Sequence, residues 1–247
     1  MSKSENKVAL VTGGARRLGK EIAHALALKG FDIIIGYNES SKSALEETIS
    51  LIKESGVNIT AVKCDLTKVQ EIQKLFRTVM VKYKKLNLLV NNAAIFSRTE
   101  FTETSEKIYD KFLDTNLKSV FFCCQEAATI MLKSEVTHSH IVNISSLGGF
   151  ENWTGYIPYS VSKAGVIKLT KQLGKKLAPK ILINSIAPGT ILIDNDENEN
   201  VDPDEVNKYP MKRFAKSKDI ISILLYLALE NSYITGQTIV VDGGKSL

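Results

Sequence analysis

The sequence predicts an α/β protein with one doubly wound parallel sheet of about seven strands and helices on both faces. Short runs rich in Val, Ile and Leu alternate with longer amphipathic segments along the whole chain. That alternation is typical of parallel strands joined by helical crossovers. The chain contains no internal repeat, low-complexity linker or break in composition. Because α/β folds of this length are routinely single, we expect one domain spanning residues 1–247.

The expected strands are short β-rich runs, and enough chain separates neighbouring runs to form a helix. They are residues 8–12, 31–37, 58–63, 86–90, 140–144, 181–186 and 237–241. The clearest helical period lies after the third run. It places one apolar stripe toward the core, formed by Ile72, Leu75, Phe76, Val79, Met80 and Tyr83.

Composition excludes several classes of protein. The net charge of +5 is modest and forms no arginine-rich or aromatic-interleaved stripe, so we expect no nucleic-acid partner. The polar start of the chain indicates no signal peptide. The longest near-apolar run, residues 220–229, is too short to span a membrane. Cys64, Cys123 and Cys124 fit neither a disulfide framework nor zinc spacing. We therefore expect a cytoplasmic protein without a membrane partner, whose cysteines lie in the core.

One acidic stretch is similar to a calcium-binding loop. Oxygen-bearing side chains between Asp194 and Glu205 fall at loop positions 1, 3, 5, 7, 9 and 12. Glu199 stands where the sixth position needs glycine, and no helix is evident before the stretch. The three histidines form no cluster either. We therefore predict no metal site and interpret residues 194–205 as a solvated, mobile lid over the substrate.

A glycine-containing turn, T-G-G-A-R-R-L-G, joins the first strand to the first helix at residues 12–19. Gly13 permits the tight turn, and Gly19 lets the helix pack closely on the strand. The free N–H groups at the start of the helix, beside Leu18, suit a pyrophosphate. The position after the first strand therefore predicts a Rossmann-type dinucleotide site.

The identity of the dinucleotide depends on charge. Arg16 and Arg17 place two guanidinium groups beside the cofactor phosphates. Tyr37 and Asn38 stand where an NAD-specific site would hold a carboxylate on the ribose. Glu39 is a competitor, but it lies two places past the end of the strand. We therefore predict that NADP(H) is preferred over NAD(H).

Two further segments follow strands and are candidates for cofactor contacts. Asp65 and Leu66 follow the third strand, where the carboxylate could reach the adenine; its alternative role is to cap the next helix. Asn92, Ala93 and Ala94 follow the fourth strand, and their small size allows close approach to a nicotinamide ribose.

Residues 146–163 carry the groups for proton chemistry. Tyr159 and Lys163 are four apart in a segment that is expected to be helical, so they share one face. A neighbouring ammonium favours the tyrosinate, so we expect a lowered phenol pKa. Ser146 ends an apolar strand and could hydrogen-bond the oxygen that receives the proton. Asn116 lies in an apolar helix, where an asparagine alone is more often solvated or bonded to the backbone.

Over essentially its whole length, the chain resembles the short-chain dehydrogenase/reductase family. The shared motifs, in family order, are T-G-x-x-x-x-x-G, N-N-A-A, Asn116, I-S-S, Y-S-V-S-K, A-P-G and V-D-G-G. The resemblance implies a catalytic tetrad of Asn116, Ser146, Tyr159 and Lys163. Family spacing selects Ser146 over Ser145, because Ser146 lies 13 residues before Tyr159.

The resemblance also implies roles. Tyr159 would be the general acid, Ser146 would polarise the substrate oxygen, and Lys163 would bind the nicotinamide ribose and tune the phenol. Asn116 would hold a helix kink and the water of a proton relay. The A-P-G motif adds Pro188 and Gly189 to the cofactor site. Homotetramers are common in the family, packed through helices that here would span about 105–132 and 158–178; a homodimer is the alternative.

Within the family, the chain resembles pteridine and dihydromonapterin reductases. Arg17 in the glycine turn and Phe96, placed where an aromatic ring stacks a flat substrate, carry this resemblance. It implies a substrate site of Arg17, Phe96, Ser146 and Tyr159. There are two departures: Ser146 stands where trypanosomatid-type pteridine reductases have Asp, and Ile193 replaces a Thr that many members have.

The function predicted from the sequence is NADPH-dependent hydride transfer to a small carbonyl or pterin-type substrate. One alternative is a 3-oxoacyl-thioester (acyl-carrier-protein) reductase, and another is a sugar or alcohol dehydrogenase. An alternative of a different class is a protein that senses NADP(H) without turnover. All four residues of the implied tetrad are present. A sensor would not require them, so the enzyme is favoured.

Overall fold

The computed structural model describes residues 7–135, 139–193 and 203–247. Its centre is a seven-stranded sheet in the order β3-β2-β1-β4-β5-β6-β9, with every neighbouring pair parallel. The strands are β1 (Val8–Thr12), β2 (Asp32–Tyr37), β3 (Ile59–Lys63), β4 (Leu88–Asn91), β5 (Ser139–Ile144), β6 (Ile181–Pro188) and β9 (Thr238–Val241). The predicted fold class and the seven predicted strands are confirmed.

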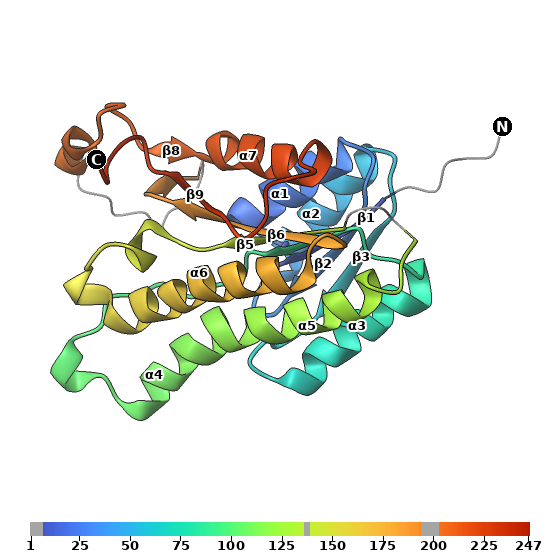
Figure 1. Cartoon of the computed structure of the whole chain (residues 1–247), viewed down its shortest axis with the longest axis horizontal. Coiled ribbons are helices and arrows are strands. Elements are labelled where there is room, and N and C mark those ends of the chain that lie inside the picture. The colour runs from blue at the N-terminus through green and yellow to red at the C-terminus, as the bar shows by residue number, and fades with distance from the viewer. Residues whose placement is uncertain (1–6, 136–138, 194–202) are drawn as a thin grey trace.

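Helices cover both faces of the sheet (Figure 1). One face carries α3, α5 and α6, and the other carries α1, α2 and α7. Their bounds are α1 (Arg17–Ala27), α2 (Lys42–Glu54), α3 (Val69–Tyr83), α4 (Glu106–Leu113), α5 (Ser119–Met131), α6 (Ile157–Leu177) and α7 (Ser217–Leu229). The strand order reverses between β1 and β4, and in such sheets ligands bind at the carboxyl edge beside that reversal.

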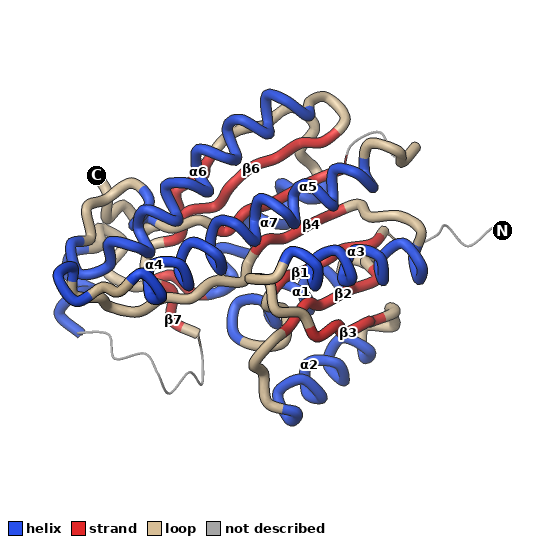
Figure 2. Tube along the Cα trace, turned by 90° about the horizontal axis from the view of Figure 1, so that it is seen from below, coloured by secondary structure: helices blue, strands red, loops and turns tan. Residues whose placement is uncertain are grey.

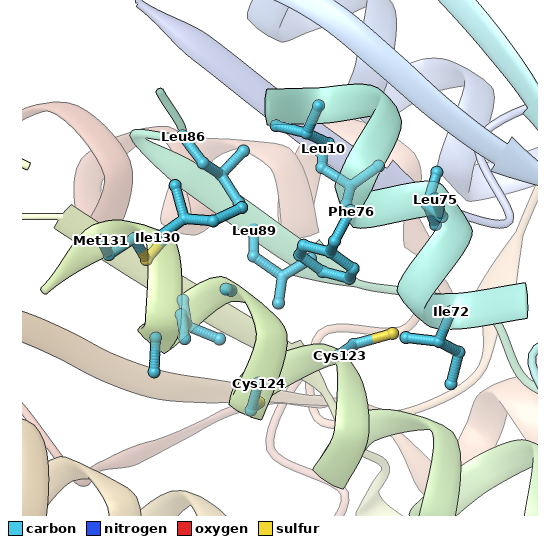
Figure 3. Packing of buried hydrophobic residues seen from close by; sticks show 14 of the residues in the cluster. Leu10, Ile72, Leu75, Phe76, Leu86, Leu89, Cys123, Cys124, Ile130 and Met131 are labelled. Carbon is cyan, nitrogen blue, oxygen red and sulfur yellow. The ribbon is translucent and has the colours of Figure 1, made fainter. Parts of the chain in front are cut away.

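Alternate strand residues feed two separate cores, because successive side chains of a strand point to opposite faces. Leu10 faces the core under α3 and α5, whereas the next residue, Val11, faces the core under α1 and α7. Figure 3 shows the first core, in which the Phe76 ring lies among apolar side chains from α3, α5 and the sheet. Both cores hold the strands in register, so the polar loops at the carboxyl edge have a fixed base.

The apolar stripe of α3 is confirmed except at its edge. Ile72, Leu75, Phe76 and Val79 are fully buried, but Met80 is 40% exposed. At 100° per residue, Met80 lies at the margin of the stripe and faces solvent. Tyr83 is half-buried, and its hydroxyl is 2.9 Å from the Thr60 hydroxyl.

The three cysteines are free and buried in the α3 and α5 core, as predicted. Burial raises the pKa of both Cys64 and Cys124 to about 12, so these thiols stay protonated at neutral pH.

A second, two-stranded sheet pairs β7 (Ile191–Leu192) with β8 (Ala215–Lys216) and was not predicted, because two-residue strands leave no periodic pattern. The chain between them includes residues 194–202, which lie outside the described residues. Most of the predicted acidic lid, including its calcium-loop positions from Asp194 to Asp202, falls there. No helix of the described chain is long and apolar enough to cross a membrane. The helices seen from below in Figure 2 instead pack along the strands of the sheet.

Candidate active site

The turn between β1 and α1 is built on two glycines. Gly13 has a φ of +64°, a left-handed conformation that side chains disfavour. A Cβ on Gly19 would collide with the Gly13 carbonyl oxygen and lie 2.6 Å from the Asn92 amide nitrogen. The start of α1 therefore packs against the loops that follow β1 and β4, with no acidic side chain in its first turn to oppose an anion.

The two arginines of this turn occupy different backbone conformations. Arg16 is extended, whereas Arg17 has a φ of +51°. Arg17 therefore holds a left-handed backbone that glycine adopts freely and in which L-residues are strained. Both arginines are exposed, beside the buried Leu18. The turn thus presents two cationic side chains at its surface.

The end of β2 offers no buried carboxylate. Tyr37 is half-buried, and Asn38 and Glu39 are exposed beyond it. The Asp65 carboxylate accepts hydrogen bonds from the Thr67 hydroxyl at 2.7 Å and the Thr67 backbone at 3.1 Å. These contacts close the turn before α3, but the N-cap of α3 is Lys68 without a side-chain cap, so the alternative role of Asp65 as the helix cap is wrong. The Thr67 hydroxyl is the largest cause of the lowered pKa of Asp65. Next to it, Leu66 packs against the core.

The segment after β4 is tied to the glycine turn. The Asn92 amide donates to the Thr12 carbonyl at 3.0 Å, and the backbone N–H groups of Asn92 and Ala93 donate to the Thr12 hydroxyl. Ala94 is exposed at the same edge. At the end of β6, the Gly189 N–H donates to Val241 at 3.0 Å, so the Pro188–Gly189 turn is fixed to β9.

The two serines after β5 face different ways. The Ser145 hydroxyl donates to the Ile186 carbonyl at 3.0 Å and accepts from the Ser185 hydroxyl at 2.6 Å, so it faces β6. Ser146 accepts from the Gly148 N–H at 3.1 Å and is hydrogen-bonded to the Tyr159 phenol. The geometry therefore pairs Ser146 with Tyr159, as family spacing implies.

Tyr159 and Lys163 share one face of α6, as predicted, but the expected pKa of the phenol is wrong for this structure. Burial raises the pKa of Tyr159 to about 12, and the hydrogen bond to Ser146 opposes that rise only in part. Lys163 Nζ donates to the Ile144 carbonyl at 2.9 Å and lies 5.7 Å from the centre of the Tyr159 ring. Burial also lowers the pKa of Lys163, to about 8. Desolvation therefore outweighs the attraction between ammonium and phenolate.

Asn116 lies in a π-helical turn, Asp114–Lys118, between α4 and α5. Its carbonyl accepts from the Ile95 N–H at 2.9 Å, and its amide donates to the Ile95 carbonyl at 3.0 Å and to the Ser162 hydroxyl at 3.2 Å. Asn116 is thus bonded to the backbone, as expected of the residue alone. The Ser162 hydroxyl in turn donates to the Tyr159 carbonyl at 2.6 Å. Sequence reasoning missed Ser162, whose signal was a hydroxyl beside the predicted lysine.

An aromatic cluster surrounds the Tyr159 ring. Phe96 stacks on Tyr156 with centroids 4.7 Å apart and an interplanar angle of 6°, and it meets Tyr159 edge-on at 4.8 Å. Trp153 lies nearly parallel to Tyr159 at 6.4 Å. Sequence reasoning missed Trp153 and Tyr156, although the only tryptophan of the chain lies six residues before Tyr159. The cluster makes the surface beside the Ser146–Tyr159 pair predominantly aromatic.

Within the described residues, no three His, Cys, Asp or Glu side chains gather in a way that could hold a metal. The predicted groups that do gather are Ser146, Tyr159, Lys163 and Asn116, all buried around the start of α6. Arg17 and Phe96, also predicted for the substrate, are exposed on the loops after β1 and β4.

Comparison with known proteins agrees with this geometry. The short chain dehydrogenase family model matches residues 7–204. The 3-oxoacyl-[acyl-carrier-protein] reductase FabG of Staphylococcus epidermidis is 36% identical over 243 residues, which are 97% of this chain and 98% of that protein. A short-chain dehydrogenase/reductase of Serratia marcescens superimposes with a TM-score of 0.90 at 29% identity, covering 98% of each chain. A variant of the actinorhodin polyketide ketoreductase, solved with NADPH, has a TM-score of 0.88 at 28% identity and covers 100% and 99%.

Proposed function

The chain belongs to the short-chain dehydrogenase/reductase family, and on that basis we propose that it reduces the ketone of a 3-oxoacyl thioester with NADPH. Membership makes it an NAD(P)-dependent oxidoreductase. The observation that carries the substrate is its full-length similarity to a 3-oxoacyl-[acyl-carrier-protein] reductase. That similarity favours the 3-oxoacyl-thioester reductase, which the sequence analysis gave as an alternative. It favours it over the pterin-type substrate in the main prediction.

The residues of the glycine turn fit a dinucleotide. The absence of a Cβ at Gly19 leaves the start of α1 close to β1, and the first-turn N–H groups suit a pyrophosphate. Arg16 and Arg17 supply cationic groups for the additional phosphate of NADPH, and neither Tyr37 nor Asn38 can accept from two ribose hydroxyls as a carboxylate does. When bound, the nicotinamide supplies the hydride. The exposed Glu39 is the group that would favour NADH.

Tyr159 is the proposed general acid. A phenol with a pKa of about 12 is protonated at neutral pH, so it arrives at the reaction holding the proton that the substrate needs. As the ketone carbon receives the hydride, its oxygen becomes an alkoxide, a stronger base than the phenolate that Tyr159 leaves behind. Ser146 accepts from the Gly148 N–H and hydrogen-bonds the Tyr159 phenol, so its hydroxyl lies beside the acid and can turn to that oxygen once the ketone is bound. The pair thus delivers a proton and stabilises the developing charge.

Lys163 is proposed to hold the nicotinamide ribose and to stabilise the phenolate that remains after proton transfer. Its ammonium lies 5.7 Å from the ring and is fixed by the Ile144 carbonyl, so little reorganisation is needed. Asn116 is proposed to hold the helix break that fixes Ile95, one residue before Phe96, to α6 through Ser162. A relay water beside Asn116 stays a prediction.

A pterin remains the second candidate substrate, and Phe96 is the observation that favours it. Its ring is 57% exposed, lies beside Tyr159 and stacks on Tyr156, so a flat heterocycle could extend this aromatic surface. Arg17, from the glycine turn, would add a charged contact.

We also propose a homotetramer, with a homodimer as the alternative. Apolar side chains on α4, α5 and α6, and at the residue that ends α5, are between 40% and 51% exposed: Ile108, Tyr109, Phe121, Val161 and Leu132. An apolar helical surface of this kind is typical of an interface. Sedimentation or light scattering measures the oligomeric state directly. A monomer at micromolar concentration would exclude both the homotetramer and the homodimer.

The substrate is tested by following NADPH oxidation with acetoacetyl thioesters, dihydropterins, simple ketones and sugars. The proposal expects the highest kcat/KM with an acetoacetyl thioester, with a 3-hydroxyacyl thioester as product. Efficient reduction of dihydropterin alone would establish the second candidate. If none of these substrates is reduced but NADPH binds tightly, a protein that senses NADP(H) without turnover is favoured.

A further inference from the structure

Lys245, the third residue from the end of the sequence, holds its ammonium against two aromatic rings. Lys245 Nζ lies 5.3 Å from the centre of the Tyr209 ring and 5.7 Å from that of Trp153. Both distances are within the range of cation–π attraction. Such contacts orient an ammonium without cancelling its charge, because a neutral ring contributes only its quadrupole.

The turn that carries Lys245 is firmly built. The Asp242 carboxylate accepts from the Gly244 N–H at 2.9 Å and from the Ser246 N–H at 2.8 Å. Gly243 and Gly244 have positive φ values of 64° and 83°, which glycine adopts without strain. The turn fixes the backbone on both sides of Lys245, and its position is therefore a property of the fold.

The ring under the ammonium is also fixed. Tyr209 is 1% exposed, and its hydroxyl donates to the Thr190 hydroxyl at 2.9 Å. Thr190 directly follows the Pro188–Gly189 turn proposed for the cofactor. The C-terminus and the first turn of α6 lie at the same end of the molecule in Figure 1.

Trp153 connects this ammonium to the proposed acid. Its ring lies 11° from parallel to the Tyr159 ring, with centroids 6.4 Å apart, so only one ring separates the charge from the general acid. The Glu151 carboxylate accepts from the Trp153 indole N–H at 2.6 Å, and Asp242 is engaged by backbone N–H groups. Among the residues that the structure describes, neither of these carboxylates nor any other forms an ion pair with Lys245.

We propose that Lys245 determines specificity by binding an anionic group, phosphate or carboxylate, at the far end of the carbonyl substrate. The proposal rests on the proposed function, which places the ketone at Ser146 and Tyr159. The Trp153 ring then supports the chain between ketone and anion, and the ammonium forms a charge-assisted hydrogen bond with the anion. For a thioester, the anion is a phosphate of coenzyme A or of a pantetheine arm.

The first test compares two thioesters with the same reacting part. Acetoacetyl-coenzyme A carries phosphates, whereas acetoacetyl-N-acetylcysteamine is neutral. Lys245→Met keeps an unbranched apolar side chain on the rings and removes the charge. We expect the ratio of kcat/KM for the charged to the neutral thioester to fall about three- to tenfold, mainly through KM. Added salt should lower the same ratio in the wild-type enzyme and have less effect in the variant.

The matched control is Lys175→Met. Lys175 is exposed in the last turn of α6, 16 residues beyond Tyr159 and thus roughly 24 Å along the helix. This variant should leave the ratio unchanged. A second pair of substrates, levulinate and ethyl levulinate, separates the sources of the anion. Loss of preference only in the coenzyme A pair identifies a phosphate, and loss only in the levulinate pair identifies a carboxylate.

Three results overturn the proposal: an unchanged ratio in both pairs, an equal loss for charged and neutral substrates, or a changed KM for NADPH in place of the substrate effect. The last result would assign Lys245 to the cofactor site.

If the wild-type enzyme reduces none of these ketones, the proposed function fails, and a binding assay then tests whether Lys245 binds an anion. Trp153 is the only tryptophan, so its emission reports titrations with coenzyme A or levulinate at saturating NADP⁺. A wild-type response that Lys245→Met abolishes supports the site, and identical or absent responses exclude it.

Discussion

The carboxyl edge of the sheet has two sides that are built differently. The nucleotide side, formed by the turn after β1 and the Asn92–Ala94 segment after β4, is built from small residues and an asparagine bonded to main chain, with Arg16 and Arg17 exposed at its surface. The substrate side, formed by the segment after β5, the start of α6 and the C-terminal turn, consists of large rings and two ammonium groups. The first side depends mainly on small residues that let the backbone segments approach closely, whereas the second depends on where large side chains are placed. Backbone geometry leaves local sequence motifs, whereas ring placement depends on the folded chain.

This difference predicts that one substitution can remove the chemistry and spare cofactor binding. Tyr159→Phe removes the transferable proton but keeps the ring between Phe96 and Trp153. We expect turnover to fall by ~10²–10⁴ with NADPH affinity nearly unchanged. Tyr156→Phe, one turn earlier, is the matched control and should stay within a few-fold of wild type. Equal losses in the two variants would contradict the role of Tyr159.

The converse substitution is Gly19→Ala on the nucleotide side. Its Cβ would displace the Gly13 carbonyl and the Asn92 amide, a strain of about 1–3 kcal/mol. NADPH affinity should therefore weaken by roughly 5–100-fold, as fluorescence titration would measure. Gly30→Ala is the control, because nothing lies within 4 Å of a Cβ there, so only its positive φ of 80° opposes the alanine. Gly30→Ala should lower the stability of the fold and leave NADPH affinity unchanged. Unchanged NADPH affinity in Gly19→Ala would contradict the claim that the nucleotide side depends on close backbone packing.

The substrate side also predicts a pH dependence of stability in the cofactor-free protein. The unfolded chain keeps the Lys163 proton up to its ordinary pKa of 10.5, whereas the folded chain loses it near 8. Because the unfolded state then holds more protons, stability contributed by this group rises between pH 8 and 10. Above pH 10 the raised pKa of Tyr159 acts in the opposite direction. Urea unfolding should show that Lys163→Met has a smaller rise over pH 8–10; an equal rise would argue against a desolvated ammonium.

A smaller effect is expected at Arg17, where the nucleotide side departs from glycine. Arg17→Gly relieves the left-handed backbone and removes a cationic side chain. Stability should rise by up to about 1 kcal/mol, whereas the preference of kcat/KM for NADPH over NADH should fall several-fold. Glu39→Gln is the companion variant. If the wild-type enzyme prefers NADH and Glu39→Gln loses that preference, Glu39 is the ribose ligand and the NADPH assignment is wrong.

The smallest expected effect separates the two candidate substrates. Phe96→Leu keeps apolar area but loses the stacking geometry, worth ~0.5–1.5 kcal/mol beyond burial. If pterins are reduced, kcat/KM for dihydropterin should fall about 2–10-fold and that for an acetoacetyl thioester should change little. Similar small changes for both substrates would leave Phe96 as an ordinary apolar wall.

The sequence was sufficient for the parts of the fold that depend on local pattern. Seven strands, the α3 stripe and the conformation required at Gly13 follow from periodicity and glycine placement alone. Ser146 was separated from Ser145 by family spacing, and the structure supplies the reason, since Ser145 faces β6. Met80 was misplaced because the margin of a helical stripe is set by the neighbouring elements.

The substrate side could be predicted only in part. Lys245 meets Trp153 across more than ninety residues of chain, and Ser162 meets Asn116 across 46. No local pattern reports such contacts. The expected pKa of Tyr159 had the wrong sign because a nearby lysine is visible in a sequence and desolvation is not. Burial was the missing quantity for the pKa, and the tertiary fold was the missing information for the contacts.

The most direct test of the account is a competition between the two candidate substrates for labelled hydride. Equal concentrations of an acetoacetyl thioester and a dihydropterin are incubated with NADPH deuterated at the transferable position, and both products are analysed by mass spectrometry. The distribution of label measures the ratio of the two kcat/KM values. We predict deuterium at carbon 3 of the 3-hydroxyacyl product and little in the pterin, with both signals lost in Tyr159→Phe. Label that accumulates in the tetrahydropterin instead would contradict the thioester assignment.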